Sequence, residues 1–216
     1  MSIYLLKPRF QALLRPTVGV LARAGVTANQ VTLAACVVSV LLGGWLYAVQ
    51  PAPWAMALLP LWLLARMALN AVDGMLAREF GQASRLGALL NEITDVISDA
   101  MLALPFAAIA PFDPLWVGVV IVLASFSELA GVLGQTVGAS RRYDGPMGKS
   151  DRAVVFGALG LWIATGAALP TASAWVMPLL AALIAATVWR RLGAALAEPN
   201  DPSAVISTVT STRSTP

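Results

Sequence analysis

Long apolar runs dominate this sequence, and they restrict its fold more than any other feature does. Six runs have about the 20-residue length that a helix needs to cross a bilayer, and short segments rich in proline, glycine or charge separate them. Only 12% of the residues are charged, whereas a soluble domain carries roughly a quarter. We therefore expect an all-α integral membrane protein. The runs cover approximately residues 30–49, 53–77, 86–110, 115–137, 153–169 and 172–189.

The basic residues predict how these runs are oriented. Of the 14 lysines and arginines, only Arg66 falls inside an apolar run. All the others lie at the termini or in alternate connections, which places them on one side of the membrane. By the positive-inside rule, that side is cytoplasmic. We predict six transmembrane helices in the plasma (inner) membrane, with both termini in the cytoplasm.

The two ends of the chain differ from its middle. Before the first run, residues 3–25 mix apolar side chains with well-spaced cations, which indicates an interfacial amphipathic helix broken near Pro16. The serine-, threonine- and proline-rich residues 196–216 are typical of a disordered polar tail. A single membrane domain is then expected over residues 1–195.

The composition also limits the chemistry that the chain can perform. It contains no histidine, and its single cysteine, Cys36, lies in an apolar run. Imidazole catalysis, histidine metal ligation and an internal disulfide are therefore excluded. A catalytic site in this protein has to use carboxylates, hydroxyls, amides, lysine or arginine.

Carboxylates are concentrated between residues 70 and 99, a stretch that holds five of the 11 acidic residues. Asp73 ends the second run, while Asn91, Asp95 and Asp99 recur every four residues and share one stripe of the third helix, with Glu92 beside them. A carboxylate at membrane depth costs about 2.5–3.5 kcal/mol, so a cation has to compensate this group. Oxygen ligands suit Mg²⁺, Mn²⁺ or Ca²⁺, and a divalent metal site is predicted here.

The segment between these carboxylates favours a phosphate ligand as well. Gly74 and Gly87 allow two helices to approach closely, as small residues do in membrane bundles. Arg78 offers a forked donor suited to phosphate oxygens. A metal site, an arginine and a close approach of two helix backbones together indicate a diphosphate site.

These residues form a recognisable pattern. It begins with Asp73-Gly74-x-x-Ala77-Arg78, continues with Gly87 after eight further residues, and ends with Asn91 and Asp95, each after three more. This pattern resembles the signature of the CDP-alcohol phosphotransferase (CDP-alcohol phosphatidyltransferase) family. The segment "VTANQVT", residues 26–32, is similar to the family's entry into its first span. Six helices with cytoplasmic termini also match, and the resemblance covers roughly residues 5–195.

The resemblance implies an enzyme of phospholipid biosynthesis. Such an enzyme transfers a phospho-alcohol group from a CDP-alcohol, usually CDP-diacylglycerol, to an acceptor hydroxyl and releases CMP. It implies two Mg²⁺ or Mn²⁺ ions, a homodimer and a site open to the cytoplasm. Its partners are membrane lipids and an unidentified hydroxyl acceptor, and no nucleic-acid partner is expected.

The resemblance also assigns roles to individual positions. Asp95 would be the catalytic residue that takes the proton from the acceptor hydroxyl. The metal ligands would be Asp73 and Asp95 with positions 70 and 91. The donor pocket would comprise Asn29, Thr32, Asp73, Gly74, Ala77, Arg78, Ser84 and Gly87.

The chain departs from the family pattern at two of its four aspartate positions. Asn70 and Asn91 stand there, so the four-position shell carries two negative charges instead of four. An amide oxygen still ligates Mg²⁺ or Mn²⁺ but brings no charge. Glu92 and Asp99 lie in the same arc of the helix and are the expected replacement ligands.

A basic connection on the same side as the carboxylates is the candidate acceptor site. The segment "SRRYDGPMGKSDR" contains four cations suited to an anionic acceptor. The alternative is that they only follow the positive-inside rule and contact anionic lipids. The four cations are Arg141, Arg142, Lys149 and Arg152.

Two charged residues lie within the apolar runs themselves. Arg66 either balances the carboxylate cluster or touches substrate. Glu128 either lines the acceptor cavity or pairs with Arg66 or a serine.

Two other classes of function stay open at this point. The carboxylates would also suit a small cation-transporting membrane protein, although a cation path gains nothing from Arg78 beside it. A catalytically inactive paralogue would bind the CDP-lipid without transferring it, because Asn70 and Asn91 weaken the metal shell.

Overall fold

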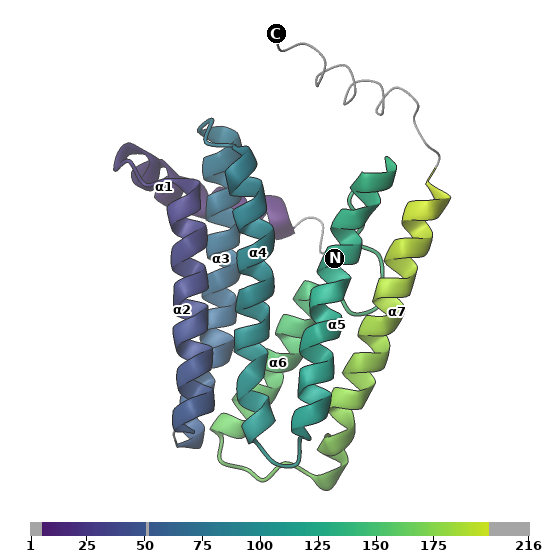
Figure 1. The fold of residues 1–216 in the computed structure, drawn as a ribbon. Helices are drawn as coiled ribbons and strands as arrows, with labels where there is room; N and C mark the ends of the chain where they lie inside the picture. Colours follow the sequence, from purple (N-terminus) through teal and green to yellow (C-terminus); the bar gives the residue numbers. More distant parts are fainter. Residues whose placement is uncertain (1–5, 51, 199–216) are drawn as a thin grey trace.

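The computed structural model describes residues 6–50 and 52–198, and within them the regular structure is entirely helical. Helices α2 to α7 stand side by side as a bundle, and α1 lies across one end of it (Figure 1). The seven α-helices are α1 (Leu6–Arg23), α2 (Ala28–Val49), α3 (Leu58–Glu79), α4 (Arg85–Ala103), α5 (Pro114–Leu133), α6 (Lys149–Ala164) and α7 (Val176–Ala197). Short 3-10 turns at Pro53–Ala57 and Thr171–Trp175 lead into α3 and α7, and others at Leu104–Ala108 and Gly134–Val137 follow α4 and α5.

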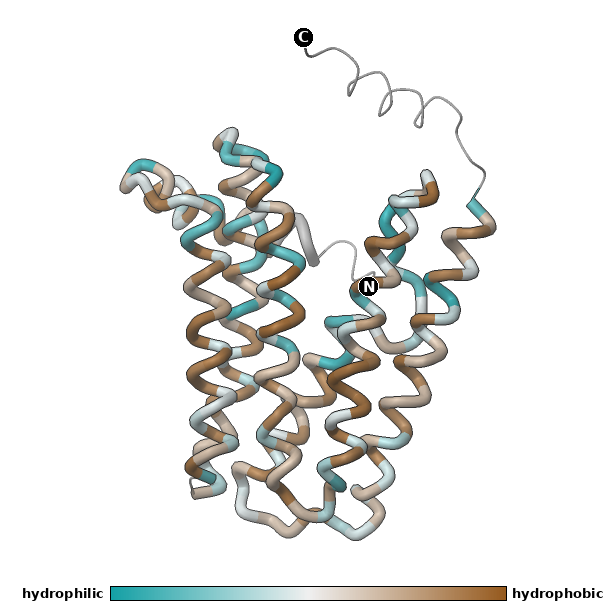
Figure 2. Tube along the Cα trace, viewed as in Figure 1, coloured by the Kyte–Doolittle hydropathy of each residue, from teal (hydrophilic) through white to brown (hydrophobic). Residues whose placement is uncertain are grey.

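Among the described residues, four helical segments are long and apolar enough to span a membrane, in agreement with the expected all-helical integral membrane protein. They are Ala28–Val49, Pro53–Glu79, Pro114–Val137 and Thr171–Ala197. Helix α4 carries the charged stripe and α6 has only 16 residues, so neither belongs to this group. Figure 2 shows hydrophilic residues gathered in the half of the bundle nearest α1. Six crossings and cytoplasmic termini stay predictions.

Helix α1 is continuous, so the predicted break near Pro16 is wrong. Pro16 lies inside the helix, where it removes one backbone hydrogen bond. Packing offsets this loss, because Val18 is fully buried against Val72 and Met75 of α3. Tertiary contacts of an amphipathic face here outweigh a local helix breaker.

The connection between α5 and α6 folds back into the bundle. Met147 is buried, and its N–H donates to Thr187 Oγ1 of α7 at 3.0 Å. Gly145 has φ +123°, and a Cβ on it would lie 2.5 Å from the Thr187 side chain, so only glycine fits at this turn. Helix α6 consequently starts inside the bundle and is short.

Helices α6 and α7 have bounds that differ from the expected ones. Lys149 and Arg152 lie in the first turn of α6, not in a connection, because the Gly148 N–H donates to Asp151 Oδ2 at 2.9 Å and caps that helix. Helix α7 runs to Ala197, beyond the predicted end of its apolar run. Residues 199–216 of the predicted tail lie outside the described residues.

Helices α2 and α4 are in close backbone contact at Gly43. A Cβ on Gly43 would lie 2.0 Å from the Met101 carbonyl oxygen, a backbone atom. A Cβ on the adjacent Gly44 would meet only the mobile end of the Met101 side chain, at 3.6 Å. The packing of α2 on α4 therefore requires glycine at position 43 and tolerates alanine at position 44.

Replacing Gly43 with alanine should force the two helices apart. We expect Gly43→Ala to lower the free energy of unfolding by about 1–3 kcal/mol, the usual cost of overpacking, measured from thermal or denaturant unfolding in detergent. Gly44→Ala is the matched control and should leave stability unchanged or slightly raised. Equal stability of the two variants would contradict this account of the contact.

Candidate active site

The start of α4 lies against the start of α2. Ser84 caps α4 by accepting a hydrogen bond from the Gly87 N–H at 3.0 Å. A Cβ on Gly87 would lie 2.8 Å from Asn29 Oδ1 of α2, so the absence of a side chain at position 87 lets Asn29 reach this turn. The structure thus brings together Asn29, Ser84 and Gly87, three of the residues predicted to bind a donor.

Gln82 was not predicted from the sequence, yet it fixes this arrangement. Its Oε1 accepts from the Ala28 N–H at 2.7 Å, and its Nε2 donates to the Val26 carbonyl at 3.3 Å. The loop between α3 and α4 is thereby tied to the first turn of α2. A glutamine in a loop carries no sequence signal that would identify its distant partner.

The end of α3 supplies an arginine and a carboxylate. The Arg78 guanidinium packs over Gly74, where a Cβ would lie 3.0 Å from its nearest nitrogen. In the part of the chain that the structure describes, Arg78 is exposed and forms no ion pair. Asp73 Oδ2 accepts a 2.7 Å hydrogen bond from the Thr32 hydroxyl of α2. Ala77 packs against the group of buried side chains that includes Val18 of α1.

Asp95 is held by side chains from two other helices. Its Oδ1 accepts from Arg66 Nη2 of α3 at 2.8 Å and lies 3.4 Å from Asn70 Nδ2. Its Oδ2 lies 2.6 Å from Lys149 Nζ of α6. The carboxylate predicted to be catalytic therefore stands at the junction of α3, α4 and α6.

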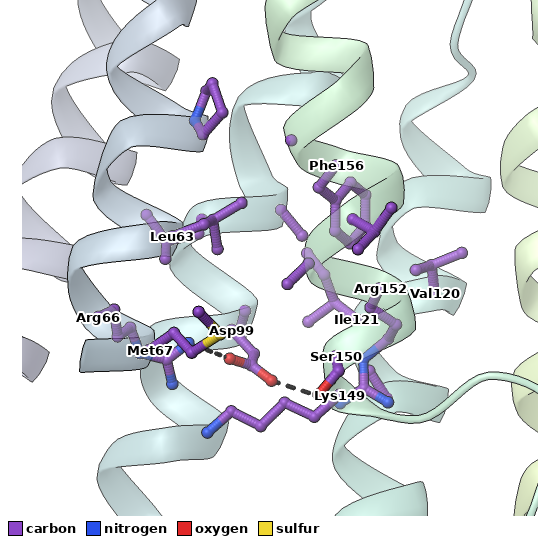
Figure 3. Close-up of a pocket in the computed structure, with 18 of the residues that line it drawn as sticks. Leu63, Arg66, Met67, Asp99, Val120, Ile121, Lys149, Ser150, Arg152 and Phe156 are labelled. Atoms are coloured by element: carbon purple, nitrogen blue, oxygen red, sulfur yellow. Dashed lines mark hydrogen bonds and ion pairs between the residues drawn. The ribbon is translucent and has the colours of Figure 1, made fainter. Parts of the chain in front are cut away.

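A chain of ion pairs continues from Asp99 across the bundle. Asp99 pairs with Arg66 and, at 3.3 Å, with Arg152 of α6 (Figure 3). Arg152 also pairs with Glu128 of α5 at 3.0 Å, and Arg191 of α7 lies 3.6 Å from the same carboxylate. Arg66 thus balances the charge of the cluster, as one of its two alternatives predicts. Within the described residues, Glu128 pairs with Arg152 and Arg191 and not with the predicted Arg66 or a serine.

The sequence predicts Arg191 only as one of the cytoplasmic cations. In the structure its side chain is buried, with 3% of it exposed. Its guanidinium donates to the Ser127 carbonyl and, at 3.2 Å, to that of Asp144. A sequence signal was present, because Leu180, Ile184, Thr187 and Arg191 follow each other at helical spacing. The first three are buried, and Arg191 extends their stripe.

Glu92 and two of the predicted acceptor residues lie apart from the Asp95 junction. Glu92 forms a bidentate pair with Arg141. Arg142 pairs with Asp144 at 2.9 Å and with Glu198 at 2.7 Å. Of the four predicted acceptor cations, the structure brings only Lys149 and Arg152 to the carboxylate cluster.

Glu198 and Asp144 tie the end of α7 to the α5–α6 connection. The Arg142 guanidinium holds the pKa of Asp144 below its usual range. Hydrogen bonds from Ser140, followed by Arg142, lower the pKa of Glu198. Lowered values mean that these contacts are present at neutral pH and are lost as the pH falls through the folded-state pKa values.

Asp73 is the residue whose surroundings fit a metal ion. It is 6% exposed, and among the described residues it forms no ion pair, whereas Asp95, Asp99 and Glu92 each have arginine or lysine partners. A buried carboxylate without a counter-charge is costly. No three acidic, histidine or cysteine side chains in the described residues are grouped to hold a metal, so amide oxygens of Asn70 or Asn91 would have to complete the shell.

A cavity of about 540 Å³ opens beside this cluster, between α3, α4, α5 and α6. One end is polar and the walls are apolar (Figure 3). Its polar end includes Arg66, Asn70, Asp99, Glu128, Lys149 and Arg152. Its walls include Leu63, Met67, Val120, Ile121, Ala124 and Phe156.

Comparison with known proteins identifies a family. The model of the CDP-alcohol phosphatidyltransferase family matches residues 25–197. The chain is 49% identical over 164 residues to the inner membrane protein YnbA of Escherichia coli strain K12, covering 76% of this chain and 81% of that protein.

Two solved structures of phosphatidylinositol phosphate synthase PgsA1 from Mycobacterium tuberculosis share the fold. One contains manganese and citrate, and it aligns with a TM-score of 0.70 and 23% identity over 85% of this chain and 89% of that chain. The other has CDP-DAG bound and aligns with a TM-score of 0.70 and 24% identity over 85% of this chain and 94% of that chain.

Removing the Glu128 charge tests the ion-pair chain. Glu128→Gln leaves the buried Arg191 with a neutral partner and the buried Arg152 with Asp99 as its one carboxylate among the described residues, so we expect the free energy of unfolding to fall by roughly 3–5 kcal/mol. Glu92→Gln makes the same change in the half-exposed pair with Arg141 and should cost about 0–1 kcal/mol. Denaturant unfolding in detergent measures both, and a smaller loss for Glu128→Gln than for Glu92→Gln would rule out this ranking.

Proposed function

The chain belongs to the CDP-alcohol phosphatidyltransferase family, and from this membership we propose that it transfers a phosphatidyl group from CDP-diacylglycerol to an acceptor hydroxyl and releases CMP. One observation carries the proposal. Among the described residues, Asp73 is a buried carboxylate without a cation and Arg78 is an arginine without an anion, and the two lie within two turns of α3. A metal-bound diphosphate supplies the charge that each of them lacks.

The donor diphosphate has a site at the start of α4. Arg78 can give forked hydrogen bonds to phosphate oxygens, and the first N–H groups of α4 attract anions. Gly74 and Gly87 carry no Cβ that would obstruct Arg78 or Asn29. That the M. tuberculosis synthase has been solved with CDP-DAG bound supports this choice of donor.

A divalent ion, Mg²⁺ or Mn²⁺, would be held by Asp73 and Asp95 with the amide oxygens of Asn70 and Asn91. When bound, it supplies neutralisation of the diphosphate and polarisation of the phosphorus under attack. Manganese in the other structure of the synthase agrees with this preference. Asp99 and Glu92 form ion pairs with arginines, and Asp95 pairs with Arg66 and Lys149, so an ion at any of these three has to displace a cation. Asp73 has no such partner among the described residues and is the first ligand we propose.

Asp95 is the proposed general base. Arg66 and Lys149 fix its carboxylate beside Asn70, which lines the cavity. The acceptor oxygen forms a bond to the phosphorus that carries the diacylglycerol, the bond from that phosphorus to the CMP oxygen breaks, and the acceptor proton passes to Asp95. Arg78 stabilises the charge that develops on the departing CMP.

Further properties of the family complete the proposal. We place the site at the cytoplasmic face of the plasma membrane, and we propose a homodimer. Donor binding without catalysis is the second candidate function, because Asn70 and Asn91 reduce the charge of the metal shell. Direct measurement of CMP release separates the two.

Replacing the proposed base tests catalysis. Asp95→Asn should lower the rate of CMP release by about 10²- to 10⁴-fold, the usual contribution of a general base, while CDP-diacylglycerol binding persists. Purified protein is assayed with CDP-diacylglycerol, Mn²⁺ and a panel of acceptors. Asp113→Asn, a change in the cap of α5, is the control and should keep full activity. Absence of CMP release from the unmodified protein with every acceptor would favour the non-catalytic alternative.

Replacing Asp73 tests the metal ligand. Asp73→Asn removes the buried charge that attracts the ion, so Mn²⁺ affinity should fall by at least about tenfold, or ~1.4 kcal/mol. Calorimetric titration or the electron paramagnetic resonance signal of free Mn²⁺ measures this without turnover. Asp113→Asn again serves as the control, and unchanged affinity in Asp73→Asn would refute the assignment.

A further inference from the structure

The walls of the proposed donor pocket come from two segments that are far apart in the sequence. Asn29 and Thr32 belong to the first turns of α2, while Arg78, Ser84 and Gly87 come from the end of α3 and the start of α4. Both segments lie at the same end of the bundle (Figure 1). Donor affinity therefore depends on how closely the start of α2 is held against the connection between α3 and α4.

Gln82 of this connection binds the turn that leads into α2. Its Oε1 accepts from the Ala28 N–H at 2.7 Å and its Nε2 donates to the Val26 carbonyl at 3.3 Å, so one side chain holds the backbone on both sides of the α2 cap. Among the described residues, the other hydrogen bond from the first two turns of α2 to α3 or α4 joins the Thr32 hydroxyl to Asp73. Gln82 is thus the tie on the side of the pocket away from the proposed metal ligand.

Gln82 acts from outside the pocket. Both polar atoms of its amide bind backbone atoms of residues that are not proposed to bind the donor. Asn29 immediately follows Ala28, and within the described part of the chain its amide has no hydrogen-bond partner, so the backbone of α2 sets its position. A Cβ on Gly87 would lie only 2.8 Å from Asn29 Oδ1. A small movement of the first turn of α2 therefore changes the pocket directly.

The same turn of α2 also has a cap of its own. The Gln30 N–H donates to Thr27 Oγ1 at 3.2 Å, and Gln30 Oε1 accepts from the Thr27 N–H at 2.9 Å. This capping box satisfies the helix end within one segment. It stabilises the helix without fixing its place against α4, and the link to a second segment comes from Gln82.

We propose that Gln82 is a positioning residue for the donor, because it holds the first turn of α2 so that Asn29 faces the nucleotide of CDP-diacylglycerol. The proposal rests on the transferase activity proposed above and concerns the donor side of the same site. Preorganised groups bind more tightly, since they are already ordered when the ligand arrives. Loss of Gln82 leaves these groups present but lets them move, so it weakens donor binding and leaves the chemical step at Asp95 unchanged.

Gln82→Met tests this role, because it keeps the length of the side chain and removes both hydrogen bonds. The Kd for CDP-diacylglycerol should rise at least about tenfold, or ~1.4 kcal/mol, in calorimetric titration of the full-length protein in detergent with Mn²⁺ and no acceptor. Gln82→Glu keeps the acceptor for the Ala28 N–H and should give an intermediate Kd. Gln30→Met is the matched control: it removes a capping hydrogen bond from the same turn of α2 and should leave the Kd unchanged.

Two further measurements distinguish positioning from general damage to the fold. Mn²⁺ affinity without donor should be the same in Gln82→Met and the unmodified protein, because Asp73 is held by Thr32 and not by Gln82. In assays of CMP release, Gln82→Met should raise KM for CDP-diacylglycerol and leave kcat unchanged. A parallel loss of Mn²⁺ affinity and kcat, or equal donor affinity of Gln82→Met and Gln30→Met, would overturn the proposal.

The outcome for Gln82 is separate from the outcome for the transferase. Donor binding that weakens in Gln82→Met, without CMP release from the unmodified protein, would refute the transferase and support the positioning role. CMP release with equal KM in Gln82→Met and Gln30→Met would overturn that role and leave the transferase intact. No binding of CDP-diacylglycerol to the unmodified protein would refute both.

Discussion

Charge compensation inside an apolar bundle is the constraint on which the rest of this structure depends. Acidic and basic side chains alternate from Asp95 to Arg66, Asp99, Arg152, Glu128 and Arg191, and each step crosses between different helices at 3.6 Å or less. Unpaired, each of these groups would be costly at membrane depth. Paired, they fix α3, α4, α5, α6 and α7 at one level, and this level is where the cavity and the proposed base meet.

Asn70 fits this constraint better than the aspartate of the family pattern would. An aspartate at position 70 would place a second carboxylate beside Asp95 and compete with it for Arg66, whereas the Asn70 amide nitrogen is directed at Asp95. Lys149 adds a positive charge on the opposite oxygen. Side-chain cations thus compensate the charge of Asp95, and Asp73 is left as the position where an added metal ion gains most. The Asn70 amide accordingly accompanies a different way of neutralising the site.

Features that depend on the spacing of residues along the chain, such as helices and short motifs, could be predicted from the sequence. The apolar runs located the helices, and the pattern from Asp73 to Asp95 identified residues that do assemble at the start of α4, including Asn29 from α2. Spacing could not identify which cation faces which carboxylate, because Glu92 and Arg141 are 49 residues apart and Arg191 and Glu128 come from different spans. The inward fold of the α5–α6 connection was missed for the same reason, since it depends on Thr187 of α7 accepting from the Met147 N–H. Tertiary partners decided each of these points.

The two halves of the site are consequently held together by different kinds of contact. The donor half is built from neighbouring segments, where Ser84, Gly87 and Gln82 close a loop onto α2, so a change there disturbs a short motif. The other half draws Arg66, Glu128 and Arg152 from three helices, and its shape follows from how those helices pack. The shape of this half can therefore vary through side chains of α5 and α6 without disturbing the donor motif. Because its ion pairs join five helices in one network, replacing any member changes the pairing of the next, whereas the donor half, in the described part of the chain, has no such coupling across the bundle.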